Sequence, residues 1–170
     1  MDVEVLLLIV LIILLTLSAI ADIKWRKIPN ILTFTVILIG LTAHGFKGGV
    51  LGLIYSVEGL FLGLALLIVF YFLGMMGAGD VKLMGAVGSL LGPAGIFKAF
   101  LFTAIVGGIF AFIVLAYKDQ LLCFIKQIML SLKLSLITRR PMFMDNEGKA
   151  SPILCYGIAI AIGTSLSMVF

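Results

Sequence analysis

Long apolar runs, separated by short polar or glycine-rich stretches, occupy most of the chain. The longer runs have about the length at which a helix crosses the hydrocarbon core of a bilayer. The pattern therefore predicts an all-α fold, a polytopic integral membrane bundle of about six transmembrane helices. No linker divides the pattern, so residues 1–170 are expected to form one domain. The predicted spans are Val5–Ala21, Ile31–Ala43, Val50–Leu73, Asp80–Leu91, Ala94–Ala116 and Pro152–Phe170.

The composition supports this interpretation. Hydrophobic residues make up 63% of the 170 residues and charged residues 12%, whereas a soluble domain is about half apolar and a quarter charged. The formal net charge is +4, but the basic residues lie between apolar runs and form no single stripe. The composition excludes a water-soluble domain and argues against nucleic-acid binding.

One apolar stretch differs from the others. Leu121–Ile137 carries Lys126 and Lys133, seven residues apart and so on one helical face, with Gln127 beside them. This pattern is typical of an amphipathic helix that lies in the membrane interface rather than spanning it.

The basic residues also predict the orientation of the bundle, because cytoplasmic loops carry an excess of lysine and arginine. No basic residue precedes the first run, so we interpret it as a retained span rather than a secretory signal. With both termini outside, only Lys47 and Lys98 face outward. Ten basic residues then face inward, namely Lys24, Arg26, Lys27, Lys82, Lys118, Lys126, Lys133, Arg139, Arg140 and Lys149.

Two aspartates stand at the cytoplasmic ends of predicted spans. Asp22 ends the first run and is followed by Pro29, which disfavours helix before it, and by Asn30, a good helix N-cap. Asp80 follows the glycine-rich stretch Gly74–Gly79 and starts a run of about a dozen residues, too short to span fully. Asp80 is therefore drawn toward the low-dielectric region, where a carboxylate must be solvated, paired or neutralised.

On this topology Asp22 and Asp80 reach the cytoplasmic face at similar depth, and we expect them to meet. Two carboxylates a few ångströms apart cannot both ionise cheaply, so one holds a proton. Such a pair can activate water to attack a peptide carbonyl, which is aspartic protease chemistry. The competing interpretation is that Asp80 only caps its helix and Asp22 only belongs to the polar loop. Lys82 would favour the charged form of Asp80 if it lies near.

A third acid, Glu58, lies within the third run. Acids inside a membrane are functional candidates by default, so Glu58 is a possible accessory residue. The alternative is a neutral or hydrogen-bonded glutamate that faces the bundle. Next to it, Gly59 and Gly63 form a Gly-x-x-x-Gly pair that would permit close helix contact.

The sequence predicts no metal site and no cofactor. Cys123 and Cys155 are far apart and belong to no Cys-x-x-Cys pair, so a zinc site or a disulfide framework is not expected. His44 is the one histidine and no other ligand set accompanies it. Aspartic protease chemistry itself requires no metal or organic cofactor.

The residues around both aspartates resemble a known family. Gly77-Ala78-Gly79-Asp80, with Lys82-Leu83 after it, resembles the Gly-x-Gly-Asp motif of membrane aspartic proteases. The stretch from Asp22 to Pro29-Asn30 resembles the other half of the signature of type IV prepilin peptidases. The stretch from Ser151 to Gly157 is similar, more loosely, to their proline-led final helix. The resemblance implies that Asp22 and Asp80 are the catalytic pair and that Gly77 and Gly79 form the motif turn.

The family implies a substrate and a place. Its members cut small membrane proteins with a short basic leader, on the cytoplasmic side, after a glycine just before an apolar helix. The chain lacks the Cys-x-x-Cys segment that larger bacterial members carry for N-methylation, and is similar to short peptidase-only forms that process Flp-type prepilins or archaeal preflagellins. We therefore expect cleavage without methylation, in the bacterial inner membrane or the archaeal cell membrane.

Two interpretations from other classes remain open at this point. The same two acids would serve as a proton relay in a small proton-coupled transporter. Alternatively, the chain is a non-catalytic assembly factor of a membrane machine. Exchanging either aspartate for asparagine separates these possibilities, since a protease loses cleavage, a transporter loses flux and a scaffold loses little.

Overall fold

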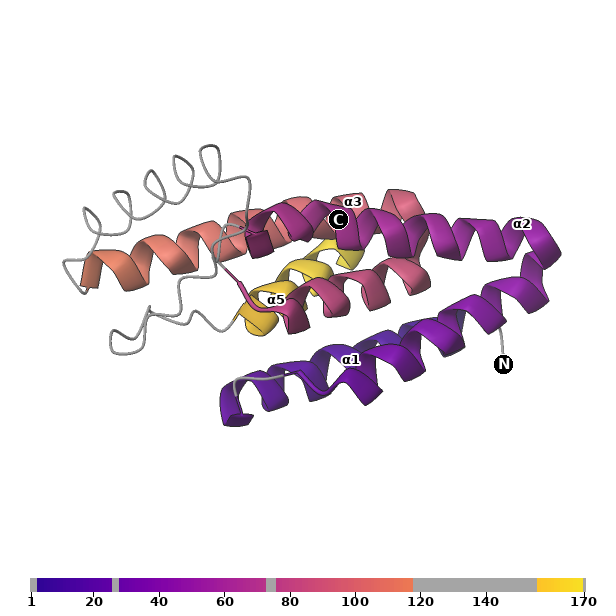
Figure 1. The fold of residues 1–170 in the computed structure, drawn as a ribbon, viewed down its shortest axis with the longest axis horizontal. Helices are drawn as coiled ribbons and strands as arrows, with labels where there is room; N and C mark the ends of the chain where they lie inside the picture. Colours follow the sequence, from indigo (N-terminus) through magenta and orange to yellow (C-terminus); the bar gives the residue numbers. More distant parts are fainter. Residues whose placement is uncertain (1–2, 26–27, 73–75, 118–155, 170) are drawn as a thin grey trace.

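The computed structural model describes residues 3–25, 28–72, 76–117 and 156–169, and within them the fold is helical. These residues form four helices (Figure 1), and the prediction of an all-α fold is confirmed for this part of the chain. α2 packs most extensively against α3, α3 packs against α5, and α1 contacts the other three. The helices are α1 (Val3–Trp25), α2 (Asn30–Phe72), α3 (Ala78–Tyr117) and α5 (Tyr156–Val169).

Two of these helices fold back on themselves, as Figure 1 shows. The backbone leaves the helical conformation at Gly49 in α2, with φ 59°, and at Gly92 in α3, with φ 70°. Positive φ is accessible to glycine at little cost because it has no Cβ. The described chain thus contains six helical segments, and they follow the six predicted apolar runs. That each segment crosses a membrane stays a prediction.

The turn in α2 is tighter than the sequence suggested. The predicted spans Ile31–Ala43 and Val50–Leu73 leave His44–Gly49 as the connection between them, but the helix continues through these residues and reverses at Gly49 alone. The two arms then lie so close that a Cβ on Gly52 would overlap the carbonyl oxygen of His44. Because glycine has no side chain at this contact, the two arms can lie close together without a longer loop between them.

The turn in α3 leaves backbone carbonyls without their helical donors. A carbonyl in an α-helix accepts from the N–H four residues on, and Pro93, which has no N–H, stands four residues after Ser89. Ser56 of α2 replaces that donor, since its Oγ donates to the carbonyl oxygen of Ser89 over 2.7 Å. Both serines are fully buried. The hydrogen bond therefore satisfies a carbonyl that water cannot reach.

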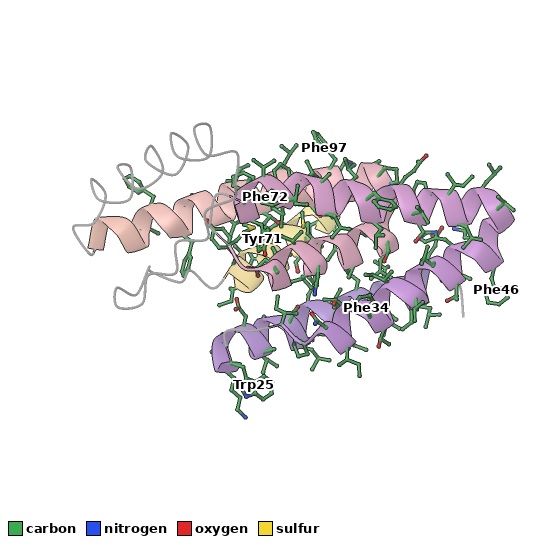
Figure 2. The ribbon with its side chains drawn as sticks, viewed as in Figure 1. Trp25, Phe34, Phe46, Tyr71, Phe72 and Phe97 are labelled. Atoms are coloured by element: carbon green, nitrogen blue, oxygen red, sulfur yellow. The ribbon has the colours of Figure 1, made fainter. Side chains whose placement is uncertain are left out.

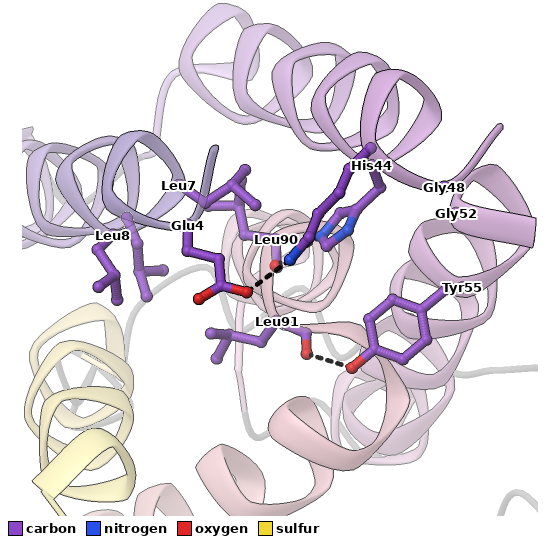
Figure 3. A pocket seen from close by; sticks show the side chains of 11 residues that line it. Glu4, Leu7, Leu8, His44, Gly48, Gly52, Tyr55, Leu90 and Leu91 are labelled. Carbon is purple, nitrogen blue, oxygen red and sulfur yellow. Dashed lines mark hydrogen bonds and ion pairs between the residues drawn. The ribbon is translucent and has the colours of Figure 1, made fainter. Parts of the chain in front are cut away.

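The next two carbonyls are satisfied by α2 in the same way (Figure 3). Nε2 of His44 lies 3.0 Å from the carbonyl oxygen of Leu90, and the Tyr55 hydroxyl donates to that of Leu91 over 3.1 Å. A carbonyl oxygen only accepts, so Nε2 of His44 must carry the hydrogen. Three polar side chains of α2 thus fasten the turn of α3. We call this part of the bundle, around Gly49 and Gly92, the turn end.

The second arm of α2 packs against the first arm of α3 through glycine. A Cβ on Gly59 would overlap the carbonyl oxygen of Gly88, and a Cβ on Gly63 would lie 2.5 Å from that of Met84. The predicted close helix contact at the Gly-x-x-x-Gly pair is therefore confirmed. Beside it, Leu83, Met84 and Val87 of α3 are fully buried and form the centre of the core.

The outside of the bundle is apolar. Large side chains such as Trp25, Phe34 and Phe46 point away from the helices (Figure 2), and Phe46 is 90% exposed. Exposed apolar surface of this extent is expected where lipid is the solvent. Among the described residues, three stretches are long and apolar enough to span a membrane, namely Val3–Trp25, Asn30–Phe72 and Ala78–Phe110. The protein is a membrane protein.

Several predicted features lie outside the described residues. They include the interfacial helix at Leu121–Ile137, both cysteines, Gly74, Arg26 and Lys27.

Candidate active site

Asp80 lies at the start of α3, in a reciprocal pair of hydrogen bonds. The N–H of Gly77 donates to Oδ2 of Asp80 over 3.2 Å, and the N–H of Asp80 donates to the carbonyl oxygen of Gly77 over 3.2 Å. A side chain in the first helical turn that reaches back to the residue before the helix is the second half of a capping box. The Asp80 side chain is 9% exposed, so the cap fixes a carboxylate that is almost out of contact with solvent.

Asp22 lies in the last turns of α1, one turn inside the helix rather than at its end. Its side chain is 8% exposed, and its Oδ2 accepts a hydrogen bond of 2.9 Å from the N–H of Gly157. Gly157 is the second residue of α5, where backbone N–H groups have no helical acceptor. A helix N-terminus is suited to an anion. The first turn of α5 therefore orients the Asp22 carboxylate.

The structure brings the two aspartates to the same end of the bundle, which we call the aspartate end. The carboxylates, 58 positions apart in the sequence, are close enough for the charge of Asp22 to act on Asp80. The charge of Asp80 in turn acts on the hydroxyl of Tyr156, the first residue of α5. Residues from α1, α3 and α5 thus converge at one place.

The other motif residues hold the chain segments around the pair. Lys82 Nζ donates to Oδ1 of Asn30 over 2.9 Å and so links the first turns of α3 and α2. The carbonyl oxygen of Pro29 accepts from the N–H of Leu32 and closes the first turn of α2. Gly79 packs on the same segment, since a Cβ there would lie 3.3 Å from Cβ of Ile28. The absence of a side chain on Gly79 allows this approach.

Glu58 is not brought to the aspartates. Its side chain is exposed, next to the buried Gly59, so it faces away from the bundle rather than into it. It lies 14 residues before the end of α2, which is about 21 Å along the helix axis. This placement contradicts the expectation of a glutamate that faces the bundle, and the distance from the pair argues against an accessory role, which stays a prediction.

Sequence reasoning missed the contribution of α5. The stretch that ends at Gly157 was noted for its likeness to a final helix, but no residue in it was assigned a contact. A Cβ on Gly157 would lie 2.8 Å from Oδ2 of Asp22. The contact joins residues 135 positions apart, so only a glycine near the start of the last apolar run could have indicated it.

A cavity lies at the turn end, far from the aspartates. It has a volume of about 600 Å³ and is lined by Glu4, His44, Lys47 and Tyr55 among others (Figure 3). Glu4 and Lys47 form an ion pair, and His44 and Tyr55 bond to carbonyls. Its polar groups therefore have structural partners. Within the described residues, no group of three or more histidine, cysteine or acidic side chains is placed to hold a metal ion.

A comparison with family models identifies the class of protein that this arrangement belongs to. Residues 9–112 match the model of the type IV leader peptidase family. Since the match covers more than half of the chain and includes both aspartates, the chain belongs to this family. α5 lies outside the matched residues. Comparisons with curated proteins and with solved structures find no match.

Proposed function

We propose that this protein is an aspartic endopeptidase in which Asp22 and Asp80 are the catalytic pair. The observation that carries the proposal is the convergence of two buried carboxylates, each oriented by a backbone N–H, at one end of a leader-peptidase bundle. Buried acids are costly unless partnered. Two buried carboxylates that repel each other do not stabilise the fold. A role in the reaction therefore explains their placement better than a structural role does.

The proposed reaction uses one carboxylate in its ionised form and one in its protonated form. The ionised aspartate takes a proton from water as the water oxygen attacks the peptide carbonyl carbon, and the protonated aspartate donates to the carbonyl oxygen. The tetrahedral intermediate then collapses: its C–N bond breaks as the leaving nitrogen receives the proton that was taken from water, and a hydroxyl of the intermediate returns a proton to the other aspartate, which restores the pair. The pair acts as a unit, so neither role is assigned to one residue. The protein supplies position and protonation state.

The proposed substrate is a pilin-like or flagellin-like precursor with a short basic leader and an apolar helix. Cleavage on the cytoplasmic side agrees with the excess of lysine and arginine predicted at the aspartate end. We propose that the new N-terminus is left unmethylated, since the sequence holds two cysteines and no Cys-x-x-Cys pair. Gly77, Gly79, Pro29, Asn30 and Lys82 are proposed to support the pair rather than to react.

The test is cleavage of a panel of precursors by the detergent-solubilised or reconstituted protein. Wild type is compared with Asp22→Asn, Asp80→Asn and, as the matched control, Glu58→Gln, which removes an acid that faces away from the bundle. We expect both aspartate variants to lose about 10²–10⁴-fold in rate and the control to retain wild-type activity. The mass of the product gives the cleavage site and the state of the new N-terminus. Cleavage by folded Asp22→Asn or Asp80→Asn at the wild-type rate would overturn the assignment.

A further inference from the structure

Tyr156, the first residue of α5, has its backbone beside one aspartate and its side chain beside the other. The next residue, Gly157, donates its N–H to Oδ2 of Asp22 over 2.9 Å, and the Tyr156 hydroxyl lies where the charge of Asp80 acts on it. We propose that this hydroxyl is a third catalytic group, which donates a hydrogen bond to the carbonyl oxygen of the scissile peptide. The proposal rests on the proposed peptidase function.

The position of the Tyr156 ring supports this role. A Cβ on Gly107, in the second arm of α3, would lie 3.4 Å from Cε1 and 3.8 Å from Cδ1 of the ring. Gly107 stands 15 residues after the turn at Gly92, and Asp80 stands 12 residues before it. These separations are about 22 Å and about 18 Å along the two arms of α3. The ring therefore contacts α3 at nearly the same height in the bundle as the Asp80 carboxylate.

The surroundings of Tyr156 do not explain its hydroxyl. Tyr156 and Met76 line a mostly apolar cavity of about 220 Å³, and the residue after Met76 is Gly77, whose N–H holds the Asp80 carboxylate. A hydroxyl among apolar walls costs free energy unless it has a partner. A phenylalanine ring would fill the same space without this cost, so packing alone does not account for a tyrosine here.

The resting pair of aspartates does not use this hydroxyl. Within the described part of the chain, no hydrogen bond joins it to Asp80, whose Oδ2 accepts from Gly77. A phenol keeps its proton at neutral pH and can donate it. A peptide bond accepts hydrogen bonds at its carbonyl oxygen, which has two lone pairs. The scissile carbonyl oxygen can therefore accept from the protonated aspartate and from Tyr156 at the same time.

The second hydrogen bond acts mainly on the transition state. As water attacks the carbonyl carbon, electron density moves to the carbonyl oxygen, and a donor that is already in place stabilises it. Tyr156 gives up no proton in this step, so the protons of the reaction remain with the water, the substrate and the aspartates. The interaction should therefore raise kcat more than it strengthens binding of the precursor.

The first test removes the hydroxyl and keeps the ring that packs on Gly107. Cleavage of the precursor is compared for wild type, Tyr156→Phe and Tyr55→Phe, with the unfolding midpoint in detergent measured beside it. Tyr55→Phe is the matched control, because the Tyr55 hydroxyl donates to the carbonyl oxygen of Leu91 at the turn end. Tyr156→Phe should lower kcat about 10²–10³-fold, the cost of one oxyanion donor, with KM nearly unchanged. Tyr55→Phe should match wild type per folded molecule.

The second test asks whether the hydroxyl contacts the scissile carbonyl itself. A precursor is made with sulfur in place of that one carbonyl oxygen, since sulfur is a weak acceptor. A direct contact makes the two changes non-additive, so Tyr156→Phe should cost less than about tenfold on the sulfur precursor. A purely structural role of the hydroxyl would instead give the same loss on both precursors.

The outcomes separate this proposal from the peptidase function. Wild type that cleaves no precursor would refute the peptidase function and the role of Tyr156 with it. Cleavage by wild type together with an unchanged kcat in folded Tyr156→Phe would refute the role of Tyr156 and keep the peptidase. Equal losses on the oxygen and sulfur precursors, or a raised KM at constant kcat, would also overturn the proposed contact.

Discussion

The turn end and the aspartate end of the bundle use hydrogen bonds of opposite direction. At the turn end, side chains of α2 donate to carbonyls of α3, as Ser56 does to Ser89. At the aspartate end, backbone N–H groups of Gly77 and Gly157 donate to carboxylates. At the turn end, side chains satisfy backbone carbonyls. At the aspartate end, backbone N–H groups orient side chains.

This difference distinguishes polar groups that stabilise the fold from polar groups that are proposed to act in the reaction. A serine hydroxyl has a single proton to donate, so the bond from Ser56 to Ser89 uses it. A carboxylate has two oxygens and about four acceptor sites, so one N–H fixes its orientation without exhausting its capacity. Polar groups at the turn end should therefore contribute mainly to stability, and those at the aspartate end mainly to activity.

The largest expected effect concerns activity alone. Asp80→Asn should reduce cleavage about 10²–10⁴-fold without lowering the unfolding midpoint. Asparagine keeps an oxygen that accepts from Gly77 and removes a charge that Asp22 repels. Sites selected for function are often not optimal for stability. Thermal unfolding in detergent, measured beside cleavage, checks both parts; a marked drop in the midpoint would show that Asp80 is structural after all.

A smaller loss of activity is expected from Gly157→Ala. The new Cβ would lie 2.8 Å from Oδ2 of Asp22, so the carboxylate must move. A displacement near 1 Å can cost about 10²-fold in rate. The matched control is Gly48→Ala at the turn end, where a Cβ meets nothing within 4 Å. Steady-state cleavage should fall in kcat for the first variant and not for the second, and equal rates would show that Asp22 does not need this contact.

Gly59→Ala tests the close packing between α2 and α3. The added Cβ would overlap the carbonyl oxygen of Gly88, so α2 and α3 must separate, at a cost of about 1–3 kcal/mol. Activity per folded molecule should change much less than with Gly157→Ala. Chemical denaturation gives the free energy of unfolding. An unchanged value would contradict the close backbone contact between these helices.

A loss of stability without any loss of activity is expected at the turn end. Ser56→Ala leaves the buried carbonyl of Ser89 without its donor and should cost about 1–3 kcal/mol of stability, with cleavage by the folded fraction unchanged. Ser165→Ala is the control, because that exposed serine donates only within its own helix. A loss of cleavage with Ser56→Ala, at full stability, would instead tie the turn in α3 to catalysis.

The sequence was sufficient to predict the helices and the two acids that the structure brings to one end of the bundle, for a physical reason. Apolar runs of span length have one stable form in lipid, and an acid at the end of such a run is conspicuous. The glycine pair at positions 59 and 63 likewise indicated the face of α2 that packs. The exposure of Glu58 was not predicted, although it agrees with the burial of Gly59, since successive residues of a helix are about 100° apart.

The sequence did not predict which residues far apart in the chain contact one another. Lys82 was considered as a partner of Asp80, yet it donates to Asn30, and its long flexible chain makes either contact sterically possible. Gly48 and Gly49 are adjacent glycines, and only the structure shows which one takes positive φ. The contact of Gly157 with Asp22 depends on how α5 docks against α1, which no local pattern encodes.

The hydrogen bond from α5 to Asp22 has a consequence for biosynthesis. Ribosomes make both aspartates well before Gly157, and at usual elongation rates the delay is several seconds. A nascent chain that ends before α5 lacks the N–H that orients Asp22. The order of translation thus leaves Asp22 without this contact while the preceding helices are being inserted.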